Sequence, residues 1–357
     1  MMEVLDHLAS LKGSMPGNGN ENLQRRWFML LKGWKMKKSI FLFGFLLILV
    51  PNLSVGQQYP TKPIKILVGY APGGSVDTTT RIIISKAEKF LEQPFIISNN
   101  GAGGGSVALG IVAKERPDGY SLVSVTTATF ALIPQFRTVT YKLEDFIPIM
   151  HFGAMQTGLV VRADSPWKTL KEFVEYAKKN PEKVAYGTAG VGLVSHLAME
   201  YIAKQEGIQW TLVPYPGMAP ALTALLGGHI TAASGDQTFA PHIREGTLRL
   251  LATHGENRMK NFPDVPTFID LGYDFKGDNM FIVAAPKGTP PSIVKKLDET
   301  FHKAMEDPEF IQAMAKMGFE ITYRNSANTK KYLEEAYARF GILIKDLKIP
   351  REPEKKS

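Results

Sequence analysis

The segment from Tyr70 to Asp77 (YAPGGSVD) has the residue types of an anion-binding site. It leaves an apolar run predicted as a strand and opens a stretch with helical periodicity. At such a junction several backbone N–H groups lack intrahelical partners and the helix dipole is positive, so a negative ligand is favoured. Glycine lets the backbone approach a ligand closely, and Ser75 or Asp77 can cap the helix. The same pattern also suits an ordinary strand-to-helix turn.

A second segment of this kind runs from Gly187 to His196 (GTAGVGLVSH). A short strand is again predicted to pass through a glycine-rich turn into a helix. Because the two turns lie in different halves of the chain, they predict a cleft between two α/β lobes with an anion-binding turn on each wall. A ligand with two carboxylates would fit that arrangement.

Motifs for nucleotide binding and catalysis are missing from the sequence. Residues 101–106 (GAGGGS) lack the last glycine of G-x-G-x-x-G, residues 187–192 space their glycines differently, and no G-x-x-x-x-G-K-[ST] occurs. The seven histidines are scattered without H-x-x-x-H spacing, and there is no G-x-S-x-G elbow. The neighbours Ser195 and His196 are no dyad, because adjacent helical side chains diverge. We therefore expect no enzyme, no cofactor and no metal site.

Short apolar runs alternate with helical-period stretches after residue 57, which is typical of an α/β fold. Strands are predicted at 63–70, 94–98, 120–126 and 184–187. Helices are predicted at 76–91, 105–114, 169–180, 195–205, 219–226, 292–306, 308–317 and 328–347. Thr169 and Glu172 have the spacing of a capping box.

The first 56 residues are predicted to be a leader. They hold seven Lys or Arg against three Asp or Glu, a large part of the net charge of +8. A signal peptide over 36–56 is predicted from three parts: the basic residues Lys35, Lys37 and Lys38, the apolar run 40–50, and the small residues Ser54 and Gly56. Residues 1–35 are interpreted as a misassigned start. We expect an exported, periplasmic chain without cysteine chemistry, and no nucleic-acid binding, since no long basic run occurs.

A series of ordered motifs resembles the receptors of tripartite tricarboxylate transporters, also called Bug proteins. These motifs are YPTKPIKILVGYAPGGSVD (59–77), NNGAGGG (99–105), RPDGYSL (116–122), VPYPGMAPALTALLGGHI (213–230), PHIREGTLRLLAT (241–253), FPDVPTFIDLGY (262–273), APKGTPPSIVKKL (285–297) and DPEFIQAMAKMGFE (307–320). The resemblance implies a type II-like periplasmic-binding-protein fold, with two α/β lobes joined by crossing strands. It places lobe 1 at 57–160 plus 280–357 and lobe 2 at 161–279.

The resemblance also implies which residues bind the ligand, largely through backbone N–H groups and ordered waters. The first wall would be Tyr70, Ala71, Gly73, Gly74, Ser75 and Asp77. The second wall would be Thr188, Ala189, Gly190, Val191, Gly192, Ser195 and His196, with Thr126, Thr127, Tyr215 and Pro216 as further members. Three residues depart from the family pattern: Thr80, Pro216 and Phe281.

The expected function is that of a monomeric receptor that captures a small organic acid and delivers it to the integral membrane permease subunits of such a transporter. A sensor that presents a carboxylate to a signalling partner is an alternative, and a secreted hydrolase is a further one. The sequence leaves the identity of the acid open, because backbone donors recognise carboxylates in general.

Overall fold

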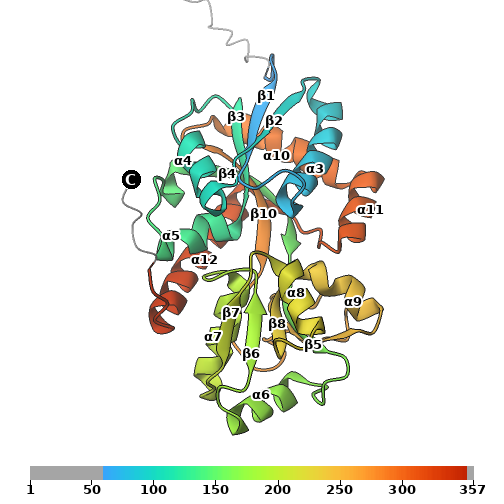
Figure 1. Cartoon of the computed structure of the whole chain (residues 1–357). Coiled ribbons are helices and arrows are strands. Elements are labelled where there is room, and N and C mark those ends of the chain that lie inside the picture. Colours follow the sequence, from blue (N-terminus) through green and yellow to red (C-terminus); the bar gives the residue numbers. More distant parts are fainter. Residues whose placement is uncertain (1–58, 352–357) are drawn as a thin grey trace, which may run out of the picture. The chain divides into compact units, whose positions relative to one another are not determined.

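The computed structural model describes residues 59–351, in which helices cover two mixed sheets (Figure 1). The large sheet has six strands in the order β11-β4-β10-β3-β1-β2. The small sheet has five strands in the order β7-β6-β8-β5-β9. The predicted α/β fold class is confirmed.

The strands of the large sheet are β1 Ile64–Val68, β2 Phe95–Asn99, β3 Ser121–Thr126, β4 Phe146–Met155, β10 Asn279–Pro286 and β11 Arg324–Asn325. Those of the small sheet are β5 Thr157–Arg162, β6 Ala185–Thr188, β7 Thr211–Pro214, β8 Ala232–Asp236 and β9 Leu248–Thr253. β1 pairs in parallel with β2 and β3, and β6 pairs in parallel with β7 and β8. These parallel groups carry the strand-to-helix turns that the sequence singled out, because a parallel neighbour requires a helical crossover.

The helices are α3 Ser75–Leu91, α4 Ser106–Val112, α5 Ile133–Phe136, α6 Leu170–Lys179, α7 Val194–Glu206, α8 Met218–Leu226, α9 Ala240–Arg244, α10 Pro291–Met305, α11 Pro308–Met317 and α12 Ser326–Asp346. Only half of the predicted capping box forms at α6. The Thr169 hydroxyl accepts from Glu172 N at 3.2 Å, but the Glu172 carboxylate accepts from Lys168 N at 2.6 Å instead of Thr169 N.

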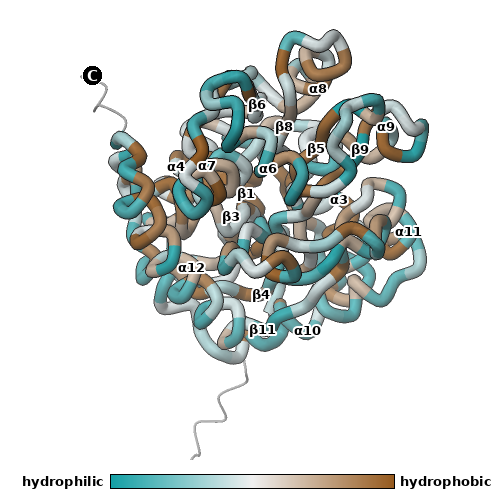
Figure 2. Tube along the Cα trace, turned by 90° about the horizontal axis from the view of Figure 1, so that it is seen from below, coloured by the Kyte–Doolittle hydropathy of each residue, from teal (hydrophilic) through white to brown (hydrophobic). Residues whose placement is uncertain are grey.

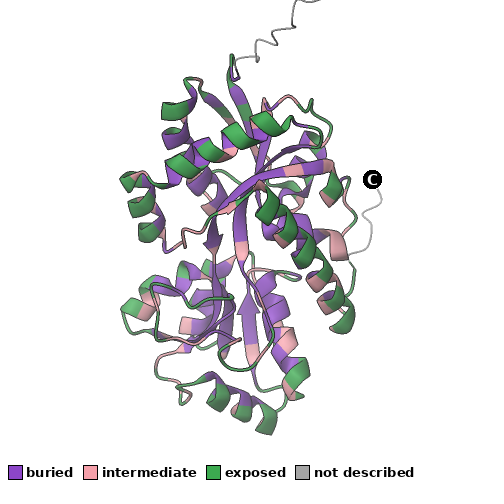
Figure 3. Ribbon diagram, turned by 180° about the vertical axis from the view of Figure 1, so that it is seen from behind, coloured by how far each residue is buried: buried purple, intermediate pink, exposed green. Residues whose placement is uncertain are grey.

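The sheets form the buried centre of the molecule, while the outer faces of the helices are exposed (Figure 3). Hydrophobic and hydrophilic stretches alternate along α12 (Figure 2), as expected of an amphipathic helix. Ile83 and Ala87 of α3 share one core cluster with Leu297 and Phe301 of α10. This packing fixes α3, and with it the turn that precedes it, against the large sheet.

The chain passes between the two sheets twice within the described residues. β4 and β5 are separated only by Gln156, and β9 leads back to β10 through residues 254–278. The crossings are bonded to each other, since His254 N donates to Thr157 O at 2.9 Å and Gln156 Nε2 donates to Asn257 O at 3.1 Å. The expected change of lobe after residue 160 falls inside β5.

Candidate functional site

The turn after β1 is held by a single buried carboxylate. Asp77 is 2% exposed, and its side chain accepts from Gly73 N at 2.8 Å, from Asn99 Nδ2 at 2.8 Å and from Arg81 Nε at 2.9 Å. Burial would raise the pKa of Asp77, but the bonds from Arg81, Gly73 and Asn99 outweigh it and keep this pKa below its ordinary value. The negatively charged Asp77 side chain therefore stabilises the turn through these three hydrogen bonds.

The start of α3 leaves backbone donors available. Gly74 occupies the N-cap position with φ −73° and ψ 169°, and no side chain caps the helix, so neither Ser75 nor Asp77 acts as the cap. Among the described residues, the first-turn N–H groups of Ser75, Val76 and Asp77 have no hydrogen-bond acceptor. Such groups, at the positive end of a helix of 17 residues, favour an anion.

The glycines of NNGAGGG support this turn from behind. A Cβ at Gly101 would lie 3.0 Å from Ala71 N, and a Cβ at Gly105 would lie 2.9 Å from Gly69 O. Gly105 also has φ +90°, a conformation that favours glycine. These glycines therefore allow two stretches of backbone to pack directly on each other, which gives that motif a structural role.

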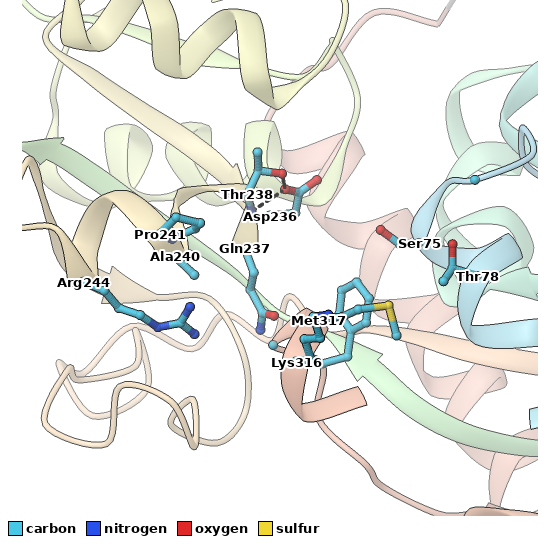
Figure 4. A pocket seen from close by; sticks show the side chains of 13 residues that line it. Ser75, Thr78, Asp236, Gln237, Thr238, Ala240, Pro241, Arg244, Lys316 and Met317 are labelled. Carbon is cyan, nitrogen blue, oxygen red and sulfur yellow. Dashed lines mark hydrogen bonds between the residues drawn. The ribbon is translucent and has the colours of Figure 1, made fainter. Parts of the chain in front are cut away.

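A cavity of about 380 Å³ lies beside the start of α3, within the usual size range of small-molecule sites. Gly73, Ser75 and Thr78 line it on one side, and residues between Asp236 and Arg244 line it on the other (Figure 4). The end of α11 completes it, with Lys316, Met317, Gly318 and Phe319. The cavity thus joins elements from both sheets.

The second predicted turn has the expected strand-to-helix geometry but does not line this cavity. Thr188 ends β6, and its carbonyl accepts from Tyr215 N at 2.9 Å, which places the predicted residues Tyr215 and Pro216 beside the turn. Gly192 has φ +76°, and a Cβ there would lie 2.8 Å from the Phe136 ring of α5. Ala189, Gly190 and Val191 are partly or fully exposed. The ligand-binding role of this turn stays a prediction.

Ser195 and His196 are buried at the start of α7, 3% and 5% exposed. His196 Nδ1 accepts from Gly192 N at 3.1 Å, and Ser195 O accepts from Ser234 Oγ at 2.9 Å. Burial lowers the pKa of His196, while Glu200 opposes that shift. The His196 ring therefore stabilises the glycine-rich turn by accepting a hydrogen bond from its backbone.

Tyr70, Thr126 and Thr127 lie together behind the first turn. The Tyr70 hydroxyl is 2.8 Å from Thr126 Oγ1 and 3.0 Å from Thr129 Oγ1, and Thr127 Oγ1 accepts from Met280 N at 3.1 Å. Both threonines of the pair 126–127 are at most 1% exposed. The Thr126 hydroxyl contacts Tyr70 at the start of the turn, whereas the Thr127 hydroxyl bonds to the backbone of β10. A direct role of either threonine in ligand binding stays a prediction.

The departures from the family pattern differ in location. Thr80 is fully buried with its Oγ1 2.6 Å from Ser124 Oγ, and Phe281 is fully buried between Phe152 and Phe319. Pro216 is exposed. Phe281 therefore packs in the core and does not line the cavity.

Several residues of the site are not predicted by the sequence patterns. Asn99 ties the turn to β2 by donating to Tyr70 O at 3.0 Å as well as to Asp77. Gln237, Arg244 and Lys316 reach the cavity from elements far apart in the chain. Arg244 and Lys316 stand inside motifs quoted for the family resemblance, but a motif does not tell which side chain faces a cavity.

Two features are absent from residues 59–351. No group of three or more His, Asp or Glu is arranged to hold a metal ion. No helix in this range is long and apolar enough to cross a membrane.

Comparison with known proteins assigns the family. The family model "Tripartite tricarboxylate transporter family receptor" matches residues 79–349. The chain is 36% identical over 298 residues to the UPF0065 protein in the gbd 5' region of Cupriavidus necator, covering 84% of this chain and 91% of that one.

Two solved structures are similar over nearly their whole length. A protein of R. palustris solved with adipate has a TM-score of 0.70 and 26% identity, and 82% of this chain covers 99% of it. MatC from Rhodopseudomonas palustris with bound malate has a TM-score of 0.66 and 28% identity, and 80% of this chain covers all of it. The chain belongs to the receptor family of tripartite tricarboxylate transporters, with the fold of periplasmic binding proteins.

Proposed function

We propose that this receptor captures a small carboxylate in the cavity beside α3 and delivers it to the integral membrane permease of a tripartite tricarboxylate-type transporter. The observation that carries the proposal is the cavity itself, where the uncapped start of α3 faces side chains from the other sheet. Relatives of similar fold were solved with adipate and with malate, which are both carboxylates.

The electrostatics of the turn support an anionic ligand. A carboxylate that accepts from two or three N–H groups gains charge-assisted hydrogen bonds, each worth about 1.5–3 kcal/mol. The one acidic side chain of the turn, Asp77, points back to Gly73 and Arg81. It therefore does not occupy the place of the ligand carboxylate.

We propose that ligand binding closes two lobes of the protein on each other, each lobe built around one of the two sheets. Lobe 1 would hold residues of about 57–160 and 280–357, and lobe 2 those of about 161–279. The boundary between them moves to the start of β5, because β5 pairs with β8 and β9 of the small sheet. Ligand would close them about Gln156 and residues 254–278. We further propose export to the periplasm through the leader 36–56, which lies outside the described residues, and action as a monomer.

A thermal-shift screen against organic acids, amino acids, neutral sugars and short oligonucleotides tests the proposal. A ligand at 100 times its dissociation constant adds about 2.7 kcal/mol to stability, which moves the melting temperature by several degrees. Stabilisation confined to carboxylates is expected. Stabilisation by neutral sugars alone, or by none of the compounds, would refute carboxylate capture.

A further inference from the structure

The glycine-rich turn after β6 lies where the two proposed lobes touch. Gly192 packs against Phe136 of α5, since a Cβ at this glycine would lie 2.8 Å from the Phe136 ring. Val194 and Leu197 of α7 share one core cluster with Phe136 and with Phe340 of α12. α7 and α12 are in contact at this place (Figure 1). The turn and the start of α7 therefore form part of the contact between lobe 2 and lobe 1.

A buried histidine holds this turn through the accepting nitrogen of its ring. Gly192 N donates to His196 Nδ1 at 3.1 Å, and His196 is 5% exposed. A ring nitrogen that accepts an N–H carries no proton, so the ring is neutral and has its own proton on Nε2. The hydrogen bond that holds the turn therefore exists only in the neutral form of His196.

A second proton on the ring would break this bond. An imidazolium donates from both nitrogens, so its Nδ1–H would point at the Gly192 N–H, and a donor cannot accept. Gly192 and His196 are both buried, so neither N–H reaches water unless the turn moves. Movement of the turn away from the ring also takes Gly192 away from Phe136.

The charged group that acts on the ring is Glu200, one helical turn further along α7. Its Oε1 lies 4.0 Å from His196 Nε2 and accepts a hydrogen bond from the Tyr186 hydroxyl of β6. Burial lowers the pKa of His196, and the charge of Glu200 opposes that shift without cancelling it.

The other elements that pack near the ring place titratable groups further away or none at all. β8 contributes the uncharged Ser234, and α12 contributes an ion pair with Lys204 at the far end of α7. The segment 254–278 meets Val194 close to His254, whose pKa burial lowers to about 3. A response to mild acid at this contact therefore points to His196.

We propose that His196 is a pH-dependent switch between the lobes, in which the neutral ring holds the turn against Phe136 and the protonated ring releases it so that the lobes separate. His196 acts through the backbone of the turn and is a positioning residue. The inference goes beyond the proposed function, because it does not depend on which ligand the cavity binds.

The pH window of the switch follows from the direction of the pKa shift. Because the bonded ring has a pKa below the ordinary 6.5, the bonded form prevails at neutral pH and is lost as the pH falls below 6.5. One pH unit below that value, the ratio of bonded to released protein should be about tenfold lower than at neutral pH.

Two amide variants that replace different ring nitrogens test the switch. In His196→Asn, Oδ1 takes the place of Nδ1 and can accept from Gly192 N at every pH. In His196→Gln, the amide reaches the place of Nε2 instead and leaves the Gly192 N–H without an acceptor. The control is His302→Asn, which removes an exposed histidine that stacks on Tyr323 of the large-sheet lobe.

The readouts report the turn and the lobes separately. NMR follows the Gly192 amide signal and the His196 ring signals between about pH 7.5 and pH 5.5. The chain has no cysteine, so Lys171→Cys of α6 and Lys303→Cys of α10, both exposed, place one spin label on each lobe. The distance between the two labels is measured over the same pH range and without ligand.

In the wild type and in His302→Asn, we expect the Gly192 signal to follow the titration of the His196 ring, and the distance between the labels to lengthen on acidification. His196→Asn should show neither change. His196→Gln should have the longer distance at both pH values.

Three results would overturn the inference: a ring that stays neutral down to pH 5.5, a label distance that stays constant while the ring titrates, or a His196→Asn protein that responds to acid as the wild type does. The first two are measured on the ring and lobes with His196 in place, so they do not depend on the folding of the His196 variants. Because no ligand is used, carboxylate capture is tested separately.

Discussion

Replacing Asp77 with Asn should destabilise the turn on which the site depends. The carboxylate is buried and accepts hydrogen bonds from Gly73 N, Asn99 Nδ2 and Arg81 Nε. An amide keeps the shape, but it exchanges one accepting oxygen for a donor and removes the charge that pairs with Arg81. At least one of the three donors then loses its acceptor.

The magnitude follows from the bonds that are lost. A hydrogen bond to a charged group contributes about 1.5–3 kcal/mol, so the unfolding free energy should fall by about 2–3 kcal/mol. For a protein of this size that lowers the melting temperature by about 5 °C. The ligand should bind about tenfold more weakly, because Gly73 and Ser75 line the cavity.

The pH dependence gives a second readout. Because the folded pKa of Asp77 lies below its ordinary 3.8, its contribution is present above that value and is lost as the pH falls through the folded pKa. The difference in stability between the wild-type protein and the variant should therefore shrink as the pH falls through the folded pKa of Asp77.

Urea denaturation at pH 7 and pH 3, with calorimetric titration of the best acid from the screen, measures these effects. The matched control is Asp264→Asn, an exposed carboxylate without a side-chain hydrogen bond among the described residues. A variant of Asp77 that melts within about 1 °C of the wild type and binds with the same affinity would show that the carboxylate does not hold the turn.

Three further predictions concern other parts of the fold. Gly73→Ala and Gly207→Ala should each lower the unfolding free energy in urea by about 1 kcal/mol, because both glycines have positive φ and open space around the Cβ position. Only Gly73→Ala should weaken ligand binding. Equal ligand affinities of the two variants would contradict this. Burial lowers the pKa of His254 to about 3, so the folded protein loses stability as the pH falls from 6.5 towards 3, where only the unfolded chain binds a proton at this residue. Between pH 7 and pH 5, the unfolding free energy of His254→Gln should therefore fall by about 2 kcal/mol less than that of the wild type. Equal losses in the two proteins would be evidence against a neutral buried ring. Burial raises the pKa of Asp278 to about 6, so Asp278→Asn should stabilise the protein by about 2–3 kcal/mol at pH 8. This gain in stability should fade below pH 6, because the wild-type carboxyl then binds its proton. No gain at pH 8 would refute the prediction.

Local patterns predicted the elements of the site well. The strand before Tyr70, the helix to Leu91 and the glycine-rich turn at 187–192 lie where periodicity and turn residues put them. α11 has the predicted bounds, because Pro308 and Gly318 mark its ends and Asp307 caps it. These features follow from short-range sequence preferences.

Other strands have no clear local signal. β8 (AASGD) contains no β-branched residue, and it is a strand because it pairs with β5 and β6 and is covered by α7 and α8. β4 and β5 read as one apolar stretch, and only the tertiary structure separates them at Gln156. Sequence periodicity cannot locate such a change of sheet.

The residues at the far end of the cavity could not be predicted from the sequence either, because tertiary packing alone brings them together. Gln237 and Gly318 meet from opposite sheets, and a Cβ at Gly318 would lie 2.8 Å from Gln237 Oε1. Arg244 and Lys316 are ordinary last-turn cations in the sequence, and only the packing of α9 and α11 turns them towards one cavity.

Backbone amide NMR tests the central claim most directly. Titration with adipate and with malate should shift the amide signals of Ser75, Val76 and Asp77 saturably, because the carboxylate accepts from these N–H groups. The signal of Gly207, which does not line the cavity, should stay in place. Saturable binding that leaves the three signals of α3 unmoved would contradict carboxylate capture at the start of this helix.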